Sequence, residues 1–174
     1  RYDGNKRATN GHGGWTDVTT DCLNQGEGYI YQTSKDGLLS VQVLKEQFGK
    51  MEANDINLEL NAYVSNSANN ASWNLLGNPF ASYYDISDMG YDAPVTIWNG
   101  NNYEAMRPGD DDYILRPFEA FFVQKANETN EICFKAGKRM TYNQSKDKKK
   151  KVAMKSPAES KRFVINLTIS DGSN

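Results

Sequence analysis

Residues 56–64 read Ile-Asn-Leu-Glu-Leu-Asn-Ala-Tyr-Val, an alternation of apolar and polar side chains with a period of two. In a β-strand this period places the apolar side chains on one face and the polar side chains on the other. Residues 39–43 and 163–169 alternate in the same way. More completely buried strands are expected at 95–98 and 118–123, and shorter candidates lie at 28–31 and 73–76.

Turn-forming residues separate these runs, among them Gly77-Asn78-Pro79, Asn99-Gly100-Asn101 and the stretch from Arg107 to Asp110. No segment carries a long apolar stripe with the helical period of 3.6 residues. The best helical candidate is one short turn at 84–88, where an Asp or Ser can cap it. We therefore predict an all-β fold with little helix, of the antiparallel β-sandwich or jelly-roll type.

Charge divides the chain into an acidic body and a basic stretch. Residues 1–137 carry 10 Lys/Arg and 19 Asp/Glu, a net charge of −9, whereas residues 138–162 carry a net charge of +8. This distribution is typical of a folded module followed by a solvated connector. We predict a β-sandwich module over 1–140 and a basic linker or long loop over 141–161. Residues 162–174 are expected to be the first strand of a following, truncated β module, or else a returning strand of the first.

The segment after the first alternating strand resembles a motif of the form GWNLIGNPYPS. That motif belongs to a β-rich module found in exported Bacteroidetes surface proteins. Residues 95–103 are similar to its YVWNGSNY strand and turn, and residues 114–123 to its IAPGQAFFVKA strand. The matching segment of this chain is Ser72-Trp73-Asn74-Leu75-Leu76-Gly77-Asn78-Pro79-Phe80.

The resemblance implies a location and an architecture rather than a chemistry. It places the chain in a multidomain bacterial protein at the cell surface or outside the cell, with the other domains of the same polypeptide as its partners. In this chain Ser72 replaces the motif's first Gly, and Arg116-Pro117-Phe118 replaces a turn that contains Gly. We expect a non-catalytic structural or adhesive module that contacts a glycan or a host surface protein. The alternative is a carbohydrate-binding module of a glycan-utilisation protein.

The residues of this motif have structural explanations of their own. The indole N–H of Trp73 needs a partner when it is buried, often a backbone carbonyl. Gly77 tolerates positive φ, and Pro79 fixes its own φ while pushing Asn78 towards extended geometry. The Asn78 amide can also bond to nearby backbone. Turn chemistry therefore predicts a structural role for the motif.

An enzymatic role is not expected, because the residues for a nucleophilic site cannot be assembled. His12 is the only histidine, in a glycine-flanked loop, and no G-x-S-x-G elbow is present. Cys22 and Cys133 are too far apart in sequence for a CxxC motif, and whether they form one disulfide is left open. Cys133 lies on the polar phase of its strand, between two apolar residues.

Two candidate binding sites follow from the residue pattern. Aromatic rings flanked by amide side chains could stack on a sugar and bond to its hydroxyls, although Trp98 could equally belong to the core. The residues of this predicted glycan platform are Trp98, Asn99, Asn101, Tyr103 and Tyr113. The acids Asp110, Asp111 and Asp112 could offer hard oxygen ligands to Ca²⁺, but their spacing does not match an EF-hand, and a solvated loop is the alternative. No other cofactor is expected.

The lysine run at 148–151 does not indicate nucleic-acid binding. It has no interleaved aromatic residues, and the acidic body beside it would repel phosphate. No apolar stretch approaches the roughly 20 residues that a membrane-spanning helix needs, so no membrane insertion is expected of this chain.

Overall fold

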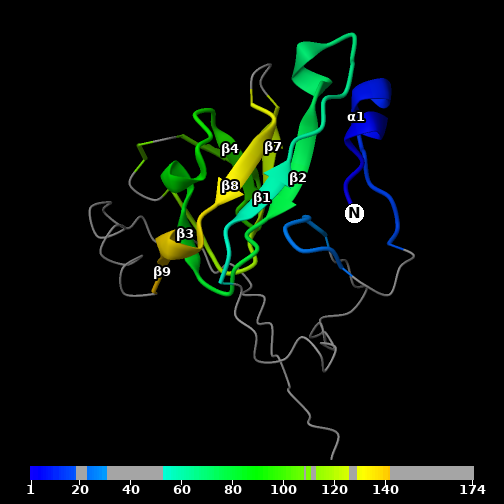
Figure 1. Cartoon of the computed structure of the whole chain (residues 1–174). Coiled ribbons are helices and arrows are strands. Elements are labelled where there is room, and N and C mark those ends of the chain that lie inside the picture. Colours follow the sequence, from blue (N-terminus) through cyan, green and yellow to red (C-terminus); the bar gives the residue numbers. More distant parts are fainter. Residues whose placement is uncertain (19–22, 31–52, 108, 111–112, 126–128, 142–174) are drawn as a thin grey trace, which may run out of the picture.

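The computed structural model describes residues 1–18, 23–30, 53–107, 109–110, 113–125 and 129–141. Within these residues the strands form three antiparallel sheets, and there is one short α-helix (Figure 1). The four-stranded sheet has the order β2 (Trp73–Gly77), β7 (Ala120–Gln124), β4 (Val95–Trp98) and β5 (Tyr103–Met106). A two-stranded sheet pairs β1 (Ile56–Glu59) with β8 (Glu131–Phe134). The third sheet has the order β6 (Ile114–Leu115), β3 (Tyr83–Asp85) and β9 (Arg139–Met140).

The predicted all-β fold is confirmed. The predicted strands at 73–76 and 95–98 correspond to β2 and β4, and the run 118–123 corresponds to β7 with a shift of two residues at its start. The candidate at 28–31 forms no strand at its described residues, and its neighbour Glu27 makes only an isolated bridge to Leu76. The strands expected at 39–43 and 163–169 lie outside the described residues, as do residues 142–161 of the predicted linker.

The first alternating strand is shorter than its sequence pattern indicates. β1 ends at Glu59, and Val64, expected on the buried face, is 94% exposed, so that part of the prediction is wrong. The pairing stops there because its partner β8 begins at Glu131, opposite Glu59, and beyond it the Leu60 N–H bonds to the Asn130 carbonyl (2.8 Å). Asn74 of β2 accepts a hydrogen bond from the Asn61 backbone N–H (2.9 Å), and its Nδ2 donates to the Asn61 carbonyl (3.0 Å). Beyond Leu60 the chain is thus held by the Asn74 side chain, together with a backbone bond from the Ser72 N–H to the Tyr63 carbonyl (3.2 Å).

The core lies where the inner face of the four-stranded sheet meets β8 and β3. Strand β7 alternates, with Phe121 and Val123 fully buried and the residues between them only partly buried. The Phe134 ring on β8 lies 6.1 Å from Phe121 and 4.8 Å from Tyr84 on β3, measured between ring centroids. These rings join the three sheets into one apolar cluster.

Two short helices differ in how well their sequence predicts them. The turn expected at 84–88 is the 3₁₀ helix η3 (Ile86–Met89), which the Asp85 carboxylate caps by accepting the Ser87 backbone N–H (3.0 Å). Helix α1 (Gly4–Asn10) was not predicted, since it lacks an apolar stripe. It is held by its caps: Asp3 accepts the N–H groups of Asn5 and Lys6, and Gly11 ends it at φ +74°.

Helix α1 and the chain around it cover the outer face of the four-stranded sheet beside β2 (Figure 1). The approach is close, because a Cβ at Gly4 would collide with the Tyr63 ring and with the Trp73 carbonyl. Only glycine allows the start of α1 to lie so near β2. An isolated antiparallel bridge between Tyr2 and Trp15 closes this N-terminal segment into a loop.

Candidate functional site

The Trp73–Phe80 motif forms bonds within the fold. The Trp73 indole N–H donates to the Asn69 carbonyl (2.8 Å), as its chemistry predicts. Asn78 is only 2% exposed, and its Nδ2 donates to the carbonyls of Ser82 and Arg116 (2.8 Å each). Its Oδ1 accepts the Phe80 backbone N–H (3.1 Å). Asn78 thereby fixes the exit of β2 to the loop that precedes β7.

The predicted glycan platform is only partly assembled. Trp98 and Tyr103 face each other across the β4–β5 hairpin and are 53% and 56% exposed. Their centroids lie 4.9 Å apart, but the ring planes meet at 63°, so the two rings do not make one flat surface. Exposed rings favour ligand contact, whereas this edge-to-face arrangement is also a stable aromatic pair in its own right.

The amides of this platform differ in what they do. Asn99 shapes the hairpin turn, because its Oδ1 accepts the backbone N–H groups of Asn101 (3.0 Å) and Asn102 (2.8 Å). Its Nδ2 donates to Glu104 at 3.3 Å, and Gly100 takes φ +99° at the tip. Asn101 is exposed beside the ring pair. Asn99 is thus committed to the turn, and Asn101 is the amide presented to solvent.

Tyr113 does not belong to the platform, which corrects the prediction. Its ring is 2% exposed and its hydroxyl donates to the Ala93 carbonyl (3.3 Å), so no face is available to a ligand. Burial also raises the pKa of Tyr113 well above the usual value of a phenol. The alternating context of the sequence could not distinguish this core tyrosine from an exposed one.

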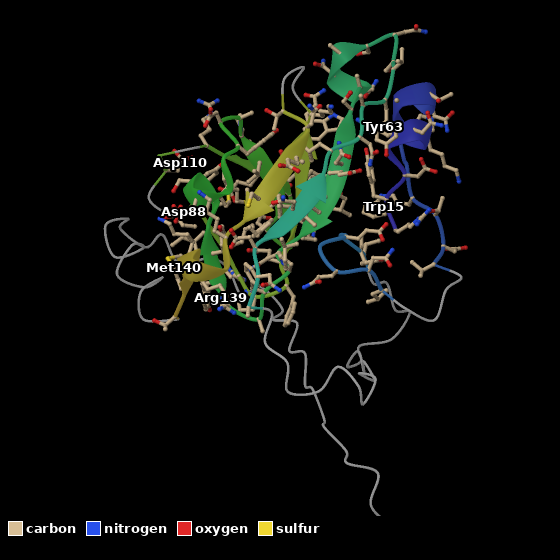
Figure 2. The ribbon with its side chains drawn as sticks, in the orientation of Figure 1. Trp15, Tyr63, Asp88, Asp110, Arg139 and Met140 are labelled. Atoms are coloured by element: carbon tan, nitrogen blue, oxygen red, sulfur yellow. The ribbon has the colours of Figure 1, made fainter. Side chains whose placement is uncertain are left out.

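The predicted calcium ligands are described only in part. The Asp110 carboxylate accepts the Arg107 backbone N–H (2.8 Å) and so closes its own turn, while Asp111 and Asp112 lie outside the described residues. Figure 2 shows Asp110 on the side of the molecule opposite Trp15. Among the described residues, no group of three or more His, Cys, Asp or Glu side chains is placed to hold a metal.

The other residues weighed for chemistry have ordinary surroundings. His12 lies exposed in its loop after α1. Cys133 is half-buried between Ile132 and Phe134, both fully buried, which confirms its polar phase. Cys22 lies outside the described residues, so a pairing of the two cysteines stays a prediction.

The structure assembles a group of rings that the sequence did not predict. They lie on the outer face of the four-stranded sheet, where Phe122 of β7 contacts four of them, and we name this group the outer aromatic cluster. The ring centroids lie 4.9 Å (Tyr2), 5.8 Å (Tyr103), 6.2 Å (Trp15) and 6.4 Å (Trp73) from that of Phe122, all close to edge-to-face.

A groove of about 360 Å³ lies among these rings. Helix α1 contributes Arg7 to its lining and β4 contributes the Thr96 hydroxyl. Tyr2 is half-buried here, and burial raises its pKa to about 12, while the positive charge of Arg7 acts in the opposite direction. The groove therefore combines aromatic walls, a protonated phenol at neutral pH and a cation.

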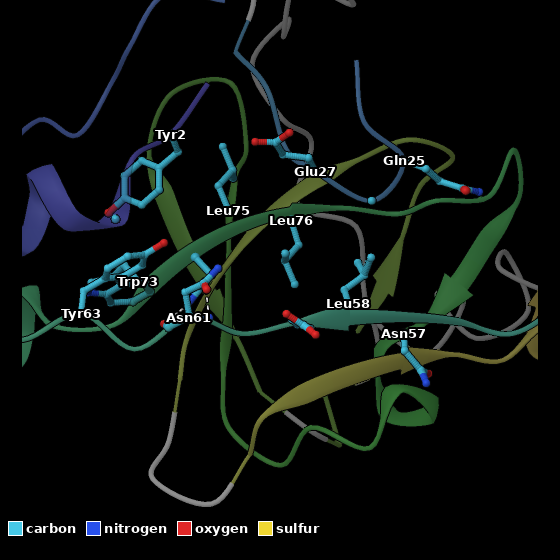
Figure 3. Close-up of a pocket in the computed structure, with 14 residues that line it drawn as sticks. Tyr2, Gln25, Glu27, Asn57, Leu58, Asn61, Tyr63, Trp73, Leu75 and Leu76 are labelled. Carbon is cyan, nitrogen blue, oxygen red and sulfur yellow. Dashed lines mark hydrogen bonds between the residues drawn. The ribbon is translucent and has the colours of Figure 1, made fainter. Parts of the chain in front are cut away.

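A second pocket of about 280 Å³ lies on the other side of Tyr2 and Trp73, between β1, β2 and residues 25–27. Figure 3 shows the rings of Tyr2, Tyr63 and Trp73 gathered at one end of it. The acid Glu27 in its lining already has partners in the protein. Glu27 accepts a hydrogen bond from the Tyr29 hydroxyl and lies 3.7 Å from the Arg1 guanidinium. Among the described residues, its lining includes the acids Glu27 and Glu59 and no Lys or Arg, so it suits an anionic ligand less than the groove does.

Comparison with known proteins does not identify a relative of this chain. No family model, curated protein or solved structure matches this chain. The part of the chain that the structure describes contains no helix long and apolar enough to cross a membrane.

One pattern in the sequence indicates the helix that lines the groove. Asp3 stands eight residues before Gly11, the spacing of an N-cap and a C-cap around a two-turn helix. That helix brings Arg7 to the sheet. The contact of Tyr2 and Trp15 with Phe122 joins residues more than 100 positions apart, and no local pattern reveals it.

Proposed function

We propose that this chain is a non-catalytic structural or adhesive module of a multidomain, exported bacterial surface or secreted protein. The proposal takes its location from the resemblance of residues 72–80, 95–103 and 114–123 to the exported β-rich module. The non-catalytic role is inferred from the hydrogen bonds that the motif's polar side chains make. Asn74 and Asn78 are buried and bonded to backbone, so they support the fold and are not free for substrate. A β-sandwich completed by further strands is part of this proposal.

One observation on the backbone supports the resemblance. The only non-glycine residues with positive φ in the described part of the chain are Ser72 (+58°) and Phe118 (+57°). Non-glycine residues adopt this conformation infrequently, whereas glycine adopts it without steric cost. Ser72 stands where the motif has its first Gly, and Phe118 aligns with the Gly of IAPGQAFFV. Both departures from the motif thus fall on backbone that suits its glycine.

Intact-cell labelling tests the location. Antibodies raised against the folded chain are applied to intact and to lysed cells of the source organism, before and after protease treatment from outside. We expect labelling of intact cells, or of the medium, that external protease abolishes. A cytosolic protein of the same cells is the control and stays protected. Signal that appears only after lysis and resists external protease overturns the proposal.

A carbohydrate-binding module is the second candidate, favoured by the exposed pair Trp98 and Tyr103. A glycan array, run with calcium and again with chelator, tests it. Binding that Trp98→Ala removes from folded protein supports this candidate, and loss with chelator alone points to the Asp110–Asp112 loop. Absence of binding in both conditions leaves the structural or protein-adhesive role.

A further inference from the structure

The groove contains a cation, Arg7, that makes no ion pair among the described residues. Arg7 is half-buried, and among the described residues no hydrogen bond or ion pair joins its guanidinium to another side chain. The nearest acid in sequence, Asp3, has its Oδ1 committed to the N–H groups of Asn5 and Lys6 (3.1 Å each). The neighbouring cation Arg1 pairs instead with Glu27. A guanidinium in this position is suited to an external carboxylate, which it can bind through two parallel hydrogen bonds.

The backbone that carries Arg7 is held in place before any ligand arrives. The backbone of α1 is capped at both ends, and the Arg7 carbonyl itself accepts the Gly11 N–H (2.9 Å). Its aromatic neighbours are braced by edge-to-face contacts around Phe122. A site built on packed elements loses little conformational entropy on binding.

The remaining lining suits a ring that carries hydroxyl groups. The Tyr2 phenol is protonated at neutral pH, as an ordinary phenol with a pKa of about 10 is, so it can both donate and accept hydrogen bonds. Thr96 adds an aliphatic hydroxyl to the lining. The aromatic walls match the C–H faces of a sugar, and about 360 Å³ is near the lower end of the roughly 300–1,000 Å³ typical of small-molecule sites.

We infer that this groove binds a pyranose ring bearing one carboxylate, with Arg7 on the carboxylate and the outer aromatic cluster on the ring. The inference rests on the carbohydrate-binding candidate for its ligand class, and not on the structural role. A single acidic group is favoured over a polyanion, because residues 1–137 carry a net charge of −9 and would repel an extended run of negative charge. Trp98 contacts Tyr103, and we expect it to contact a neutral sugar linked to the acidic one.

The test compares two ligands that differ only in the acidic group. The full chain is titrated at low ionic strength with methyl β-D-glucuronide and with methyl β-D-glucoside, followed by the chemical shifts of backbone and indole N–H groups. We expect the glucuronide to bind roughly tenfold more tightly or better, since a charge-assisted hydrogen bond is worth at least that factor. The shifted resonances should include the Trp15 indole, and added salt should weaken the binding.

Variants of Arg7 separate charge from shape. Arg7→Gln is expected to remove the preference for the glucuronide, and Arg7→Lys to retain part of it. Arg107→Gln, at an exposed arginine that does not line the groove, is the matched control and leaves the preference intact. Near-ultraviolet circular dichroism verifies that each variant is folded.

The outcomes of these titrations separate the carboxylate inference from carbohydrate binding in general. Equal binding of the two glycosides, or an acid preference that survives Arg7→Gln in folded protein, overturns the carboxylate inference while carbohydrate binding stands. No binding of either glycoside overturns the inference as well, and leaves the structural role, which the intact-cell labelling tests by itself.

Discussion

Replacement of Asn78 by alanine tests whether the motif builds the fold. The side chain is 2% exposed and makes three hydrogen bonds, to the backbone of Phe80, Ser82 and Arg116. Two of these bonds join segments close in sequence, and the third reaches the loop before β7, 38 positions away. Asn78→Ala removes all three at once and offers the backbone groups no new partner.

The loss of stability in Asn78→Ala depends on which backbone groups lose their hydrogen-bond partner. The Phe80 N–H lies in a buried bond, and an unsatisfied buried donor costs about 1–3 kcal/mol. The two carbonyls are part-buried, so water can satisfy them in part and each costs less. We expect a loss of about 3 kcal/mol in the free energy of unfolding, a large share of the 5–15 kcal/mol typical of a domain. The melting temperature should fall by about 10 °C.

The assay is urea unfolding of the full chain, followed by tryptophan fluorescence and by far-ultraviolet circular dichroism. Asn101→Ala is the control, since Asn101 is an exposed asparagine in a turn, and its change should stay within about 0.5 kcal/mol. Asn78→Asp keeps the acceptor for Phe80 but places a buried carboxylate against the Ser82 and Arg116 carbonyls, so it should lose at least as much as Asn78→Ala. A loss for Asn78→Ala no larger than that of the control refutes the reasoning.

Two further predictions concern backbone conformation and pH. Phe118→Gly should leave the free energy of unfolding unchanged or raise it by up to about 1 kcal/mol, because positive φ costs a non-glycine residue about 1–2 kcal/mol while glycine adds chain entropy. Thermal unfolding measures this, and a loss above about 1 kcal/mol would show that the half-exposed ring packs in the fold. Burial raises the pKa of Tyr2 and of Tyr84 to about 12, above an unfolded value of about 10. The stability that this contributes is complete below about pH 10 and is lost as the pH rises through 12, so urea midpoints between pH 8 and 12 should fall, and constant midpoints contradict the prediction.

Much of the fold could be predicted from the sequence where one residue's neighbours decide its environment. The alternation in β8 and the apolar run of β4 gave the strands, and Asp85 gave the capped turn at η3. The extent of β1 could not be predicted, because it is set by its partner β8, which begins at Glu131, opposite Glu59. Nothing local to residues 60–64 reveals where that distant strand begins.

The candidate site was predicted less well, for a physical reason. Trp98 and Tyr103 were found because a hairpin joins them. Tyr113 was misplaced, since an aromatic beside acids can be buried as readily as exposed, and only its tertiary contacts decide. The groove depends on α1 bringing Arg7 and Tyr2 to β7, and such long-range packing leaves no periodic signal in the sequence.

The central claim is that the Trp73–Phe80 motif builds the fold rather than a binding surface, and hydrogen exchange of the Asn74 and Asn78 side-chain amides tests it most directly. Both amides donate to backbone carbonyls, so they should exchange only when the protein opens. The account predicts strong protection of both Nδ2 groups compared with the exposed Asn101 amide, unchanged when methyl β-D-glucuronide is added. Exchange of the Asn78 amide as fast as that of Asn101 would contradict it.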